Sequence, residues 1–274
     1  MKSRRKKGSN KSRKRGIYVL PNLFTSASLF SGFYAIIAAI QGRYETAAVA
    51  ILISFLLDGL DGRIARFTNT TSRFGTEFDS LSDLVAFGVA PGVLAFKWAL
   101  APLGRLGWLA CFMYVICGAL RLARFNVQKD SLEANFFKGL PIPGAASFVA
   151  SLVLFTTALG VMPESRQIII ITMIYVLSFL MVSTLDYPNF KEFHLKKQKP
   201  FNALVTIILI LMVIAYKPKI MLFIILVIYV LSGPIVTIYR SHKKLAENNR
   251  HLMEKTPPES NGVNNSGSPG IDRS

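Results

Sequence analysis

Four aspartates stand at two regular spacings around one polar stretch of an otherwise apolar sequence. Asp58 and Asp61 are three residues apart, and Asp79 and Asp83 are four apart, so each pair shares one face of a helix. Converging carboxylates repel one another unless cations neutralise them. Ligand sets made only of oxygen favour hard ions such as Mg²⁺, Mn²⁺ or Ca²⁺, and a pair of ions can stabilise the entering and leaving oxygens of phosphoryl transfer. The spacing therefore predicts a metal site suited to phosphoryl transfer.

Small residues and an arginine are interleaved with the aspartates. The small residues, which leave the backbone open to a bulky ligand, are Gly62, Ala65 and Gly75. Arg66 could pair with a phosphate. The structural alternative is a set of salt bridges from Asp58 or Asp61 to Arg63 or Arg66. Two basic partners do not balance four acids and leave the small residues unexplained, so we favour a ligand site.

Long apolar blocks must position these side chains. A helix needs about 20 apolar residues to cross a bilayer. Blocks of about that length occur at 18–40, 45–66, 81–100, 106–125, 144–162, 167–185, 202–216 and 219–239. The sequence therefore predicts an all-α polytopic integral membrane helical bundle of about eight transmembrane helices. The aspartates then lie on a helical hairpin at the ends of the second and third helices, with Thr70, Thr71 or Ser72 capping the second arm.

The formal net charge of +17 raises the question of a nucleic-acid partner. If the N-terminus is cytoplasmic, most lysines and arginines fall on the inner side of the predicted bundle, as the positive-inside rule requires. Contact with an anionic lipid bilayer explains the charge more simply than nucleic acid does. We therefore expect no nucleic-acid binding.

The aspartates and their neighbours form one extended motif, D-x-x-D-G-x-x-A-R, then eight residues, then G-x-x-x-D-x-x-x-D. Its positions here are Asp58, Asp61, Gly62, Ala65, Arg66, Gly75, Asp79 and Asp83. The motif resembles the signature of the CDP-alcohol phosphatidyltransferase family at every position. The resemblance implies an integral membrane enzyme, usually a homodimer, that moves a phosphatidyl or similar group from a CDP-linked donor to an alcohol.

The same resemblance implies roles for these residues. Asp58, Asp61 and Asp79 would hold metal, while Asp83 would complete a second metal site and act as the general base. The CDP moiety would lie against Gly62, Ala65, Arg66 and Gly75. The implied cofactor is Mg²⁺ or Mn²⁺, as two ions.

Composition and the resemblance together suggest an organisation of the chain. A cationic cytoplasmic arm is expected at 1–16 and a six-helix family core at 17–185. A basic loop and two additional transmembrane helices would occupy 186–245, followed by a disordered polar tail at 246–274. Together with the charge bias, the family suggests a bacterial inner (cytoplasmic) membrane with both termini in the cytoplasm.

A second resemblance concerns the acceptor. Three segments are similar to the phosphatidylserine synthase branch of the family: PNLFTSASLFSG at 21–32, GALRLARFNV at 118–127 and FFKGLPIPGAAS at 136–147. The implied reaction is CDP-diacylglycerol plus L-serine giving phosphatidylserine and CMP. Glycerol 3-phosphate or an inositol phosphate stays open as an alternative acceptor.

Cationic and polar residues in these segments are candidates for substrate binding. Arg121, Arg124 or Lys138 could hold the serine carboxylate, and Asn126 could accept its ammonium group or orient an arginine. The alternative is that the arginines anchor a helix end at the interface. The cytidine or diphosphate could contact two residues of the first span, Asn22 and Thr25, although helix capping would explain them equally well.

A divalent-cation transporter is the alternative from another functional class. A transport path should place polar groups along several helices across the whole membrane. Here the acidic cluster sits at one interface, and the spans after residue 144 carry almost no interior charge. We therefore favour the transferase.

Overall fold

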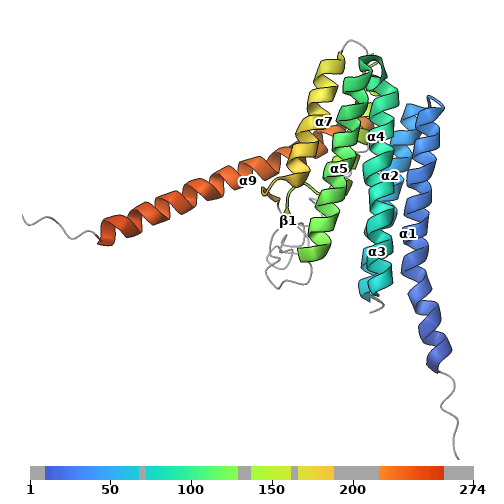
Figure 1. Ribbon diagram of the computed structural model, residues 1–274, viewed down its shortest axis with the longest axis horizontal. Helices are drawn as coiled ribbons and strands as arrows, with labels where there is room; N and C mark the ends of the chain where they lie inside the picture. Colours follow the sequence, from blue (N-terminus) through green and yellow to red (C-terminus); the bar gives the residue numbers. More distant parts are fainter. Residues whose placement is uncertain (1–9, 68–71, 129–136, 162–165, 188–215, 256–274) are drawn as a thin grey trace, which may run out of the picture. The chain divides into compact units, whose positions relative to one another are not determined.

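The computed structural model describes residues 10–67, 72–128, 137–161, 166–187 and 216–255, and these are almost entirely helical (Figure 1). The helices are α1 (Asn10–Ile40), α2 (Tyr44–Phe67), α3 (Arg73–Asp83), α4 (Ala90–Ala95), α5 (Arg105–Gln128), α6 (Ile142–Ala158), α7 (Gln167–Val182) and α9 (Pro218–Lys255). Two-residue strands, β1 (Phe137–Lys138) and β2 (Asp186–Tyr187), form one antiparallel pair. The predicted all-α class is confirmed.

The third predicted span is longer than the apolar block that indicated it. α3 continues through two π-helical segments, η1 (Leu84–Val89) and η2 (Phe96–Leu100), and ends in a 3-10 turn, η3 (Ala101–Leu103). Figure 1 shows α3 and α4 as one rod between α1 and α5. Pro91 lacks an N–H, so the carbonyl of Phe87 loses its helical donor and accepts a hydrogen bond from the hydroxyl of Tyr114 instead, at 3.1 Å.

The apolar character of the helices makes this a multi-pass membrane protein. Among the described residues, four helical segments are long and apolar enough to cross a membrane: Pro21–Ile40, Arg73–Leu103, Arg105–Val127 and Pro218–Ile238. The helices α6 and α7 are apolar but shorter. The predicted span at 202–216 lies outside the described residues.

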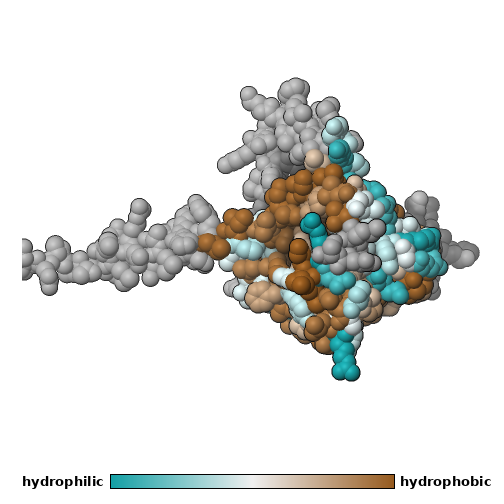
Figure 2. All heavy atoms as spheres, turned by 90° about the horizontal axis from the view of Figure 1, so that it is seen from above, coloured by the Kyte–Doolittle hydropathy of each residue, from teal (hydrophilic) through white to brown (hydrophobic). Residues whose placement is uncertain are grey.

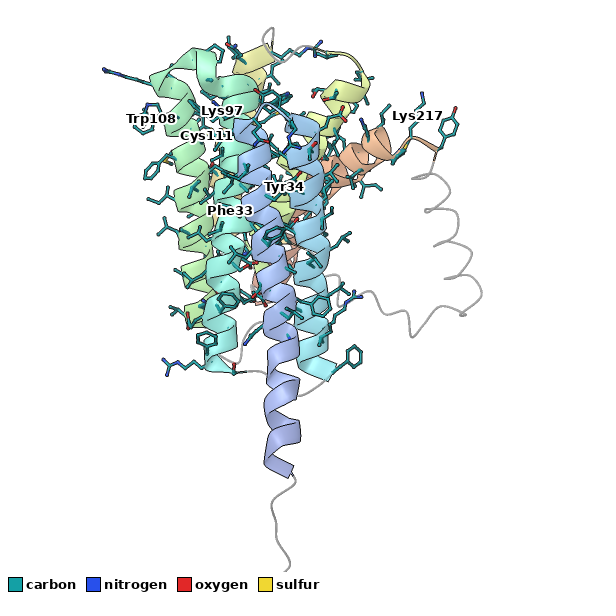
Figure 3. All side chains as sticks on the ribbon, turned by 90° about the vertical axis from the view of Figure 1, so that its right-hand side faces the viewer. Phe33, Tyr34, Lys97, Trp108, Cys111 and Lys217 are labelled. Atoms are coloured by element: carbon teal, nitrogen blue, oxygen red, sulfur yellow. The ribbon has the colours of Figure 1, made fainter. Side chains whose placement is uncertain are left out.

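Large apolar side chains cover the outside of the bundle, as expected of a surface in contact with lipid. Phe30 is 71% exposed and Phe179 is 73% exposed. The side chain of Trp108 points away from the bundle (Figure 3). Brown, hydrophobic atoms also cover much of the described surface seen from above (Figure 2).

Small residues bring α1, α2 and the third rod together. The hydroxyl groups of Ser28 and Ser54 lie 2.8 Å apart, and Ser31 donates to the carbonyl of Ala50 at 2.8 Å. A methyl group at Gly32 would lie only 2.6 Å from the Cα of Ala86, so the backbones touch there. Such contacts are typical of membrane helices, whose packing depends on close backbone approach. They fix α1 against the two helices that carry the aspartates.

The chain divides into two compact units, Met1–Val236 and Thr237–Ser274. The described part of the second unit is helical from Thr237 to Lys255, so helix extends into the segment 246–274 predicted as a polar tail. The helical stretch from Thr237 to Lys255 contains no Gly or Pro and is rich in good helix formers such as Lys, Leu, Ala and Glu. Likewise α1 begins at Asn10, within the predicted arm.

Candidate metal and acceptor site

Three aspartates meet where the end of α2 faces the start of the third rod. Asp58, Asp61 and Asp79 each contribute a carboxylate oxygen, and these oxygens lie within 4.8 Å of one another. Asp61 is buried, with 5% of its surface exposed, and the other two are half-buried. The helical hairpin predicted from the spacing therefore brings the two pairs of acids together.

Asp83 joins this cluster from one helical turn further along α3. Its side chain shares a hydrogen bond with that of Asp58, and it also interacts electrostatically with Asp79 and Asp61. Asp83 immediately precedes the π-helical segment η1. Inserted π turns change which way the following side chains face and are frequent at functional sites.

A divalent cation fits this donor set. The ligands are all carboxylate oxygens, which hard ions prefer, and no softer sulfur or nitrogen ligand belongs to the described cluster. Oxygens bound to one Mg²⁺ lie at most about 4.2 Å apart, twice the metal–oxygen distance, so the observed spacing requires only a small contraction. The alternative of a salt-bridge network finds no support at Arg63, which is exposed and pairs with neither Asp58 nor Asp61.

Thr25 of α1 forms hydrogen bonds with both helical segments that carry the aspartates. The Thr25 hydroxyl donates to Asp61 Oδ2 at 2.8 Å, and the carbonyl of Thr25 accepts a hydrogen bond from Ser82 at 3.2 Å. Thr25 is 4% exposed. It thus orients a carboxylate, and a contact with the CDP moiety stays a prediction.

The start of α3 is built as predicted. Ser72 is the N-cap, and its hydroxyl accepts a hydrogen bond from the backbone N–H of Gly75 at 3.0 Å. A methyl group at Gly75 would lie 3.1 Å from Ser72 Oγ and 3.4 Å from Asn22 Oδ1. Gly75 and Asn22, both predicted to contact CDP, are therefore neighbours. Gly62 follows Asp61 directly on α2.

Three predicted site residues lie where the backbone is described but the side chain is not. Ala65 and Arg66 belong to the last turn of α2, and Lys138 belongs to β1. Their predicted contacts with CDP and with the acceptor fall outside the described residues.

Arg121 is a buried cation beside the aspartates. Only 8% of its surface is exposed, and its guanidinium group interacts electrostatically with Asp83 and with Tyr229 of α9. Its Nε is buried without a hydrogen-bond partner among the described residues. Buried donors are nearly always paired in proteins, so this open N–H can donate to an acceptor atom of a bound ligand.

The other predicted acceptor residues of α5 contact neighbouring helices. Arg124 donates from Nη1 to the carbonyl of Val182 at 3.3 Å, at the end of α7. Asn126 donates from Nδ2 to Ser80 Oγ at 2.9 Å. The contact of Arg124 agrees with the helix-end alternative, and a direct role in substrate binding stays a prediction for both residues.

Two tyrosines near Arg121 were not singled out from the sequence. Tyr187 of β2 is fully buried, and its ring lies against that of Tyr229 with centroids 6.0 Å apart. Burial, and to a smaller extent Tyr229, raises the pKa of the Tyr187 hydroxyl, which therefore stays a neutral donor and binds the carbonyl of Val230 at 3.2 Å. Both tyrosines occur outside any motif, so no spacing could have marked them.

The family model described as CDP-alcohol phosphatidyltransferase matches residues 18–179. The chain belongs to the CDP-alcohol phosphatidyltransferase family. The resemblance inferred from the aspartate motif is thus confirmed, and the chain is a membrane transferase rather than the cation transporter considered as an alternative. The matched region ends within α7 and leaves α9 beyond it.

Three known proteins are similar to this chain over more than half of its length. A Helicobacter pylori strain J99 protein named CDP-diacylglycerol--serine O-phosphatidyltransferase is 37% identical over 234 residues, covering 85% of this chain and 97% of that protein. A Bacillus subtilis protein of the same name is 36% identical over 173 residues, or 63% of this chain and 92% of that protein. Archaetidylserine synthase of Methanothermobacter thermautotrophicus is 36% identical over 172 residues, or 62% of this chain and 70% of that protein.

Proposed function

We propose that this chain transfers the phosphatidyl group from CDP-diacylglycerol to the hydroxyl of L-serine and releases phosphatidylserine and CMP. The names of its relatives support serine as the acceptor. The observation that carries the proposal is the buried Arg121 next to Asp83, with an open N–H on its guanidinium group. A serine carboxylate bound to Arg121 would hold the hydroxyl, three bonds away, close to the carboxylate of Asp83.

The aspartates would hold one or two divalent cations, Mg²⁺ or Mn²⁺. Asp58, Asp61 and Asp79 are the first set of ligands, and Asp83 completes a second site. When bound, the cations neutralise charge on the donor diphosphate and on the leaving CMP. The chain's own contribution is to fix the ligands, which Thr25 does for Asp61 through the 2.8 Å hydrogen bond.

Proton transfer would fall to Asp83, which takes the proton from the serine hydroxyl as the oxygen attacks the β-phosphorus, the phosphorus that carries the diacylglycerol. The bond between that phosphorus and the oxygen bridging to CMP breaks in line with the attack. The CDP moiety would lie against Gly62, Ala65, Arg66, Gly75 and Asn22. Because the donor is a lipid and serine is water-soluble, a site at the membrane interface admits both.

The membrane that holds the enzyme and its orientation there are part of the proposal. We place it in the inner membrane of a bacterium with both termini in the cytoplasm, where its basic segments meet anionic lipid headgroups. A homodimer is expected from the family.

Release of CMP by the purified protein tests the function. Micelles would contain CDP-diacylglycerol, with serine, glycerol 3-phosphate or inositol phosphate added in turn, each with Mg²⁺, Mn²⁺ or a chelator. Metal-dependent release with serine alone is the expected result. Release with another acceptor only would keep the chemistry and overturn the assignment of serine.

A further inference from the structure

The first half of α9 packs against α6 and β2, although α9 lies beyond the region that the family model matches. Phe223 stacks on Phe155 of α6 with ring centroids 4.5 Å apart, and it also contacts Phe148 at 5.6 Å. Two turns along, the ring of Tyr229 lies so close to Gly144 that a methyl group there would be 3.0 Å from Tyr229 Cε1. These contacts lie within the first compact unit, Met1–Val236.

The position of Tyr229 is defined from a second side by the chain segment after α7. Tyr187 packs its ring against Tyr229 and donates its hydroxyl to the backbone of α9 at Val230. The strand that carries Tyr187 pairs with β1, and the backbone N–H of Leu140 donates to the carbonyl of Leu180 at 2.9 Å. Tyr229 is therefore held in place by packing on α6 and on β2.

The phenol of Tyr229 interacts electrostatically with the guanidinium group of Arg121. Arg121 in turn interacts with Asp83, the residue proposed to take the proton from the acceptor. The three groups come from α9, α5 and α3, and the guanidinium group of Arg121 interacts with both of the others. A guanidinium group and a phenol hydroxyl both donate hydrogen bonds, and a carboxylate has two oxygens that can accept from both at once.

We propose that the hydroxyl of Tyr229 and the guanidinium group of Arg121 together bind the carboxylate of an amino-acid acceptor. α9 then belongs to the active site and sets the acceptor specificity of the enzyme. This inference rests on the proposed function, because it requires an acceptor that carries a carboxylate beside its hydroxyl. Tyr229 is a specificity-determining residue in this scheme, and the aspartates carry out the chemistry.

The variant Tyr229→Phe removes the hydroxyl and keeps the ring that packs on Gly144 and Tyr187. Its KM for serine should rise about 10-fold or more, the usual effect of losing one hydrogen bond to a charged group. Its KM for CDP-diacylglycerol should change less than about twofold. Wild-type enzyme should prefer serine to serinol, which has the hydroxyl and the amine but no carboxylate, and the variant should lose that preference by the same factor as its KM for serine.

Tyr175→Phe is the matched control, because Tyr175 is 40% exposed on α7 and belongs to no part of the site. It should behave as wild type. An unchanged preference for serine over serinol in Tyr229→Phe would overturn the inference, and so would an equal rise in both KM values, which would place the hydroxyl on the donor. Failure of the wild-type enzyme to use serine would instead overturn the proposed function, whatever the variant does.

Discussion

At the scale of single residues, the site contains two kinds of side chain. Charged side chains would bind the ligands, and neutral side chains fix the charged ones in position. Asp58, Asp61 and Asp79 converge within 4.8 Å. Thr25 has no charge, but the hydrogen bond from its hydroxyl fixes the orientation of the Asp61 carboxylate. Arg121 provides a buried positive charge that interacts with Asp83. Substitutions at these positions should therefore affect different kinetic parameters.

Replacement of the proposed base should remove turnover and leave donor binding. Asp83→Asn keeps the size of the side chain but cannot take a proton, so kcat should fall by about 100-fold or more. Binding of CDP-diacylglycerol, measured by equilibrium binding to the purified variant, should stay within a few-fold of wild type. Turnover that survives in this variant would remove Asp83 as the base.

Loss of the supporting hydrogen bond should weaken metal binding. Thr25→Val keeps the shape of the side chain and removes the donor to Asp61, so the Mg²⁺ concentration for half-maximal activity should rise about 10-fold. Thr25→Ser retains the hydroxyl and should restore the wild-type value. If both variants need the same Mg²⁺ concentration as wild type, Thr25 does not support a metal ligand.

At the scale of elements, backbone hydrogen bonds bind the segment before α6 to the chain around the end of α7. The segment between β1 and α6 is bound to the end of α7 and to the residues after it. The N–H of Leu140 donates to the carbonyl of Leu180 and the N–H of Gly139 to the carbonyl of Leu185, both at 2.9 Å. Gly139 has φ of +82°, a conformation that residues with a side chain rarely adopt. This segment precedes Gly144, against which Tyr229 packs.

Two glycines allow the effect of contact to be separated from that of backbone strain. A methyl group at Gly139 would collide with the carbonyl oxygen of Met181, whereas at Gly160, with φ of +65°, it would meet nothing within 4 Å. Both substitutions to Ala cost about 1 to 2 kcal/mol from the left-handed backbone. Gly139→Ala should therefore lower Tm clearly more than Gly160→Ala does, as measured by thermal unfolding in detergent. Equal losses would mean that the segment moves freely away from α7.

At the scale of the whole molecule, the features that could be predicted from the sequence were those written in local spacing. The aspartate hairpin, the cap at Ser72 and the apolar helices all follow from patterns within a few turns of chain. The contacts of Tyr229 and Tyr187 join residues that are distant in the sequence and belong to no motif. The apolar block at 81–100 marked only part of the rod from Arg73 to Leu103, because the first turns of the rod, which carry the aspartates, are polar.

The acidic cluster also links metal binding to the stability of the whole bundle, since its ligands come from two helices, α2 and α3. A ligand that binds only the folded state stabilises it by about 2.7 kcal/mol at a concentration of 100 times its Kd. Added Mg²⁺ should therefore raise the Tm of wild-type protein by several degrees, without any substrate present. The rise should be much smaller in Asp61→Asn, which lacks a buried ligand.

Wild-type protein and a variant with one aspartate changed to asparagine should rank in the opposite order when a chelator removes the metal. Four neighbouring carboxylates then repel one another, and the conversion of one to an amide relieves part of that repulsion. We therefore expect the Tm of Asp58→Asn in chelator to equal or exceed that of wild type. If Asp58→Asn is less stable than wild type by the same amount with Mg²⁺ and with chelator, Asp58 stabilises the bundle without binding the metal. The metal site would then have to be formed by the remaining aspartates.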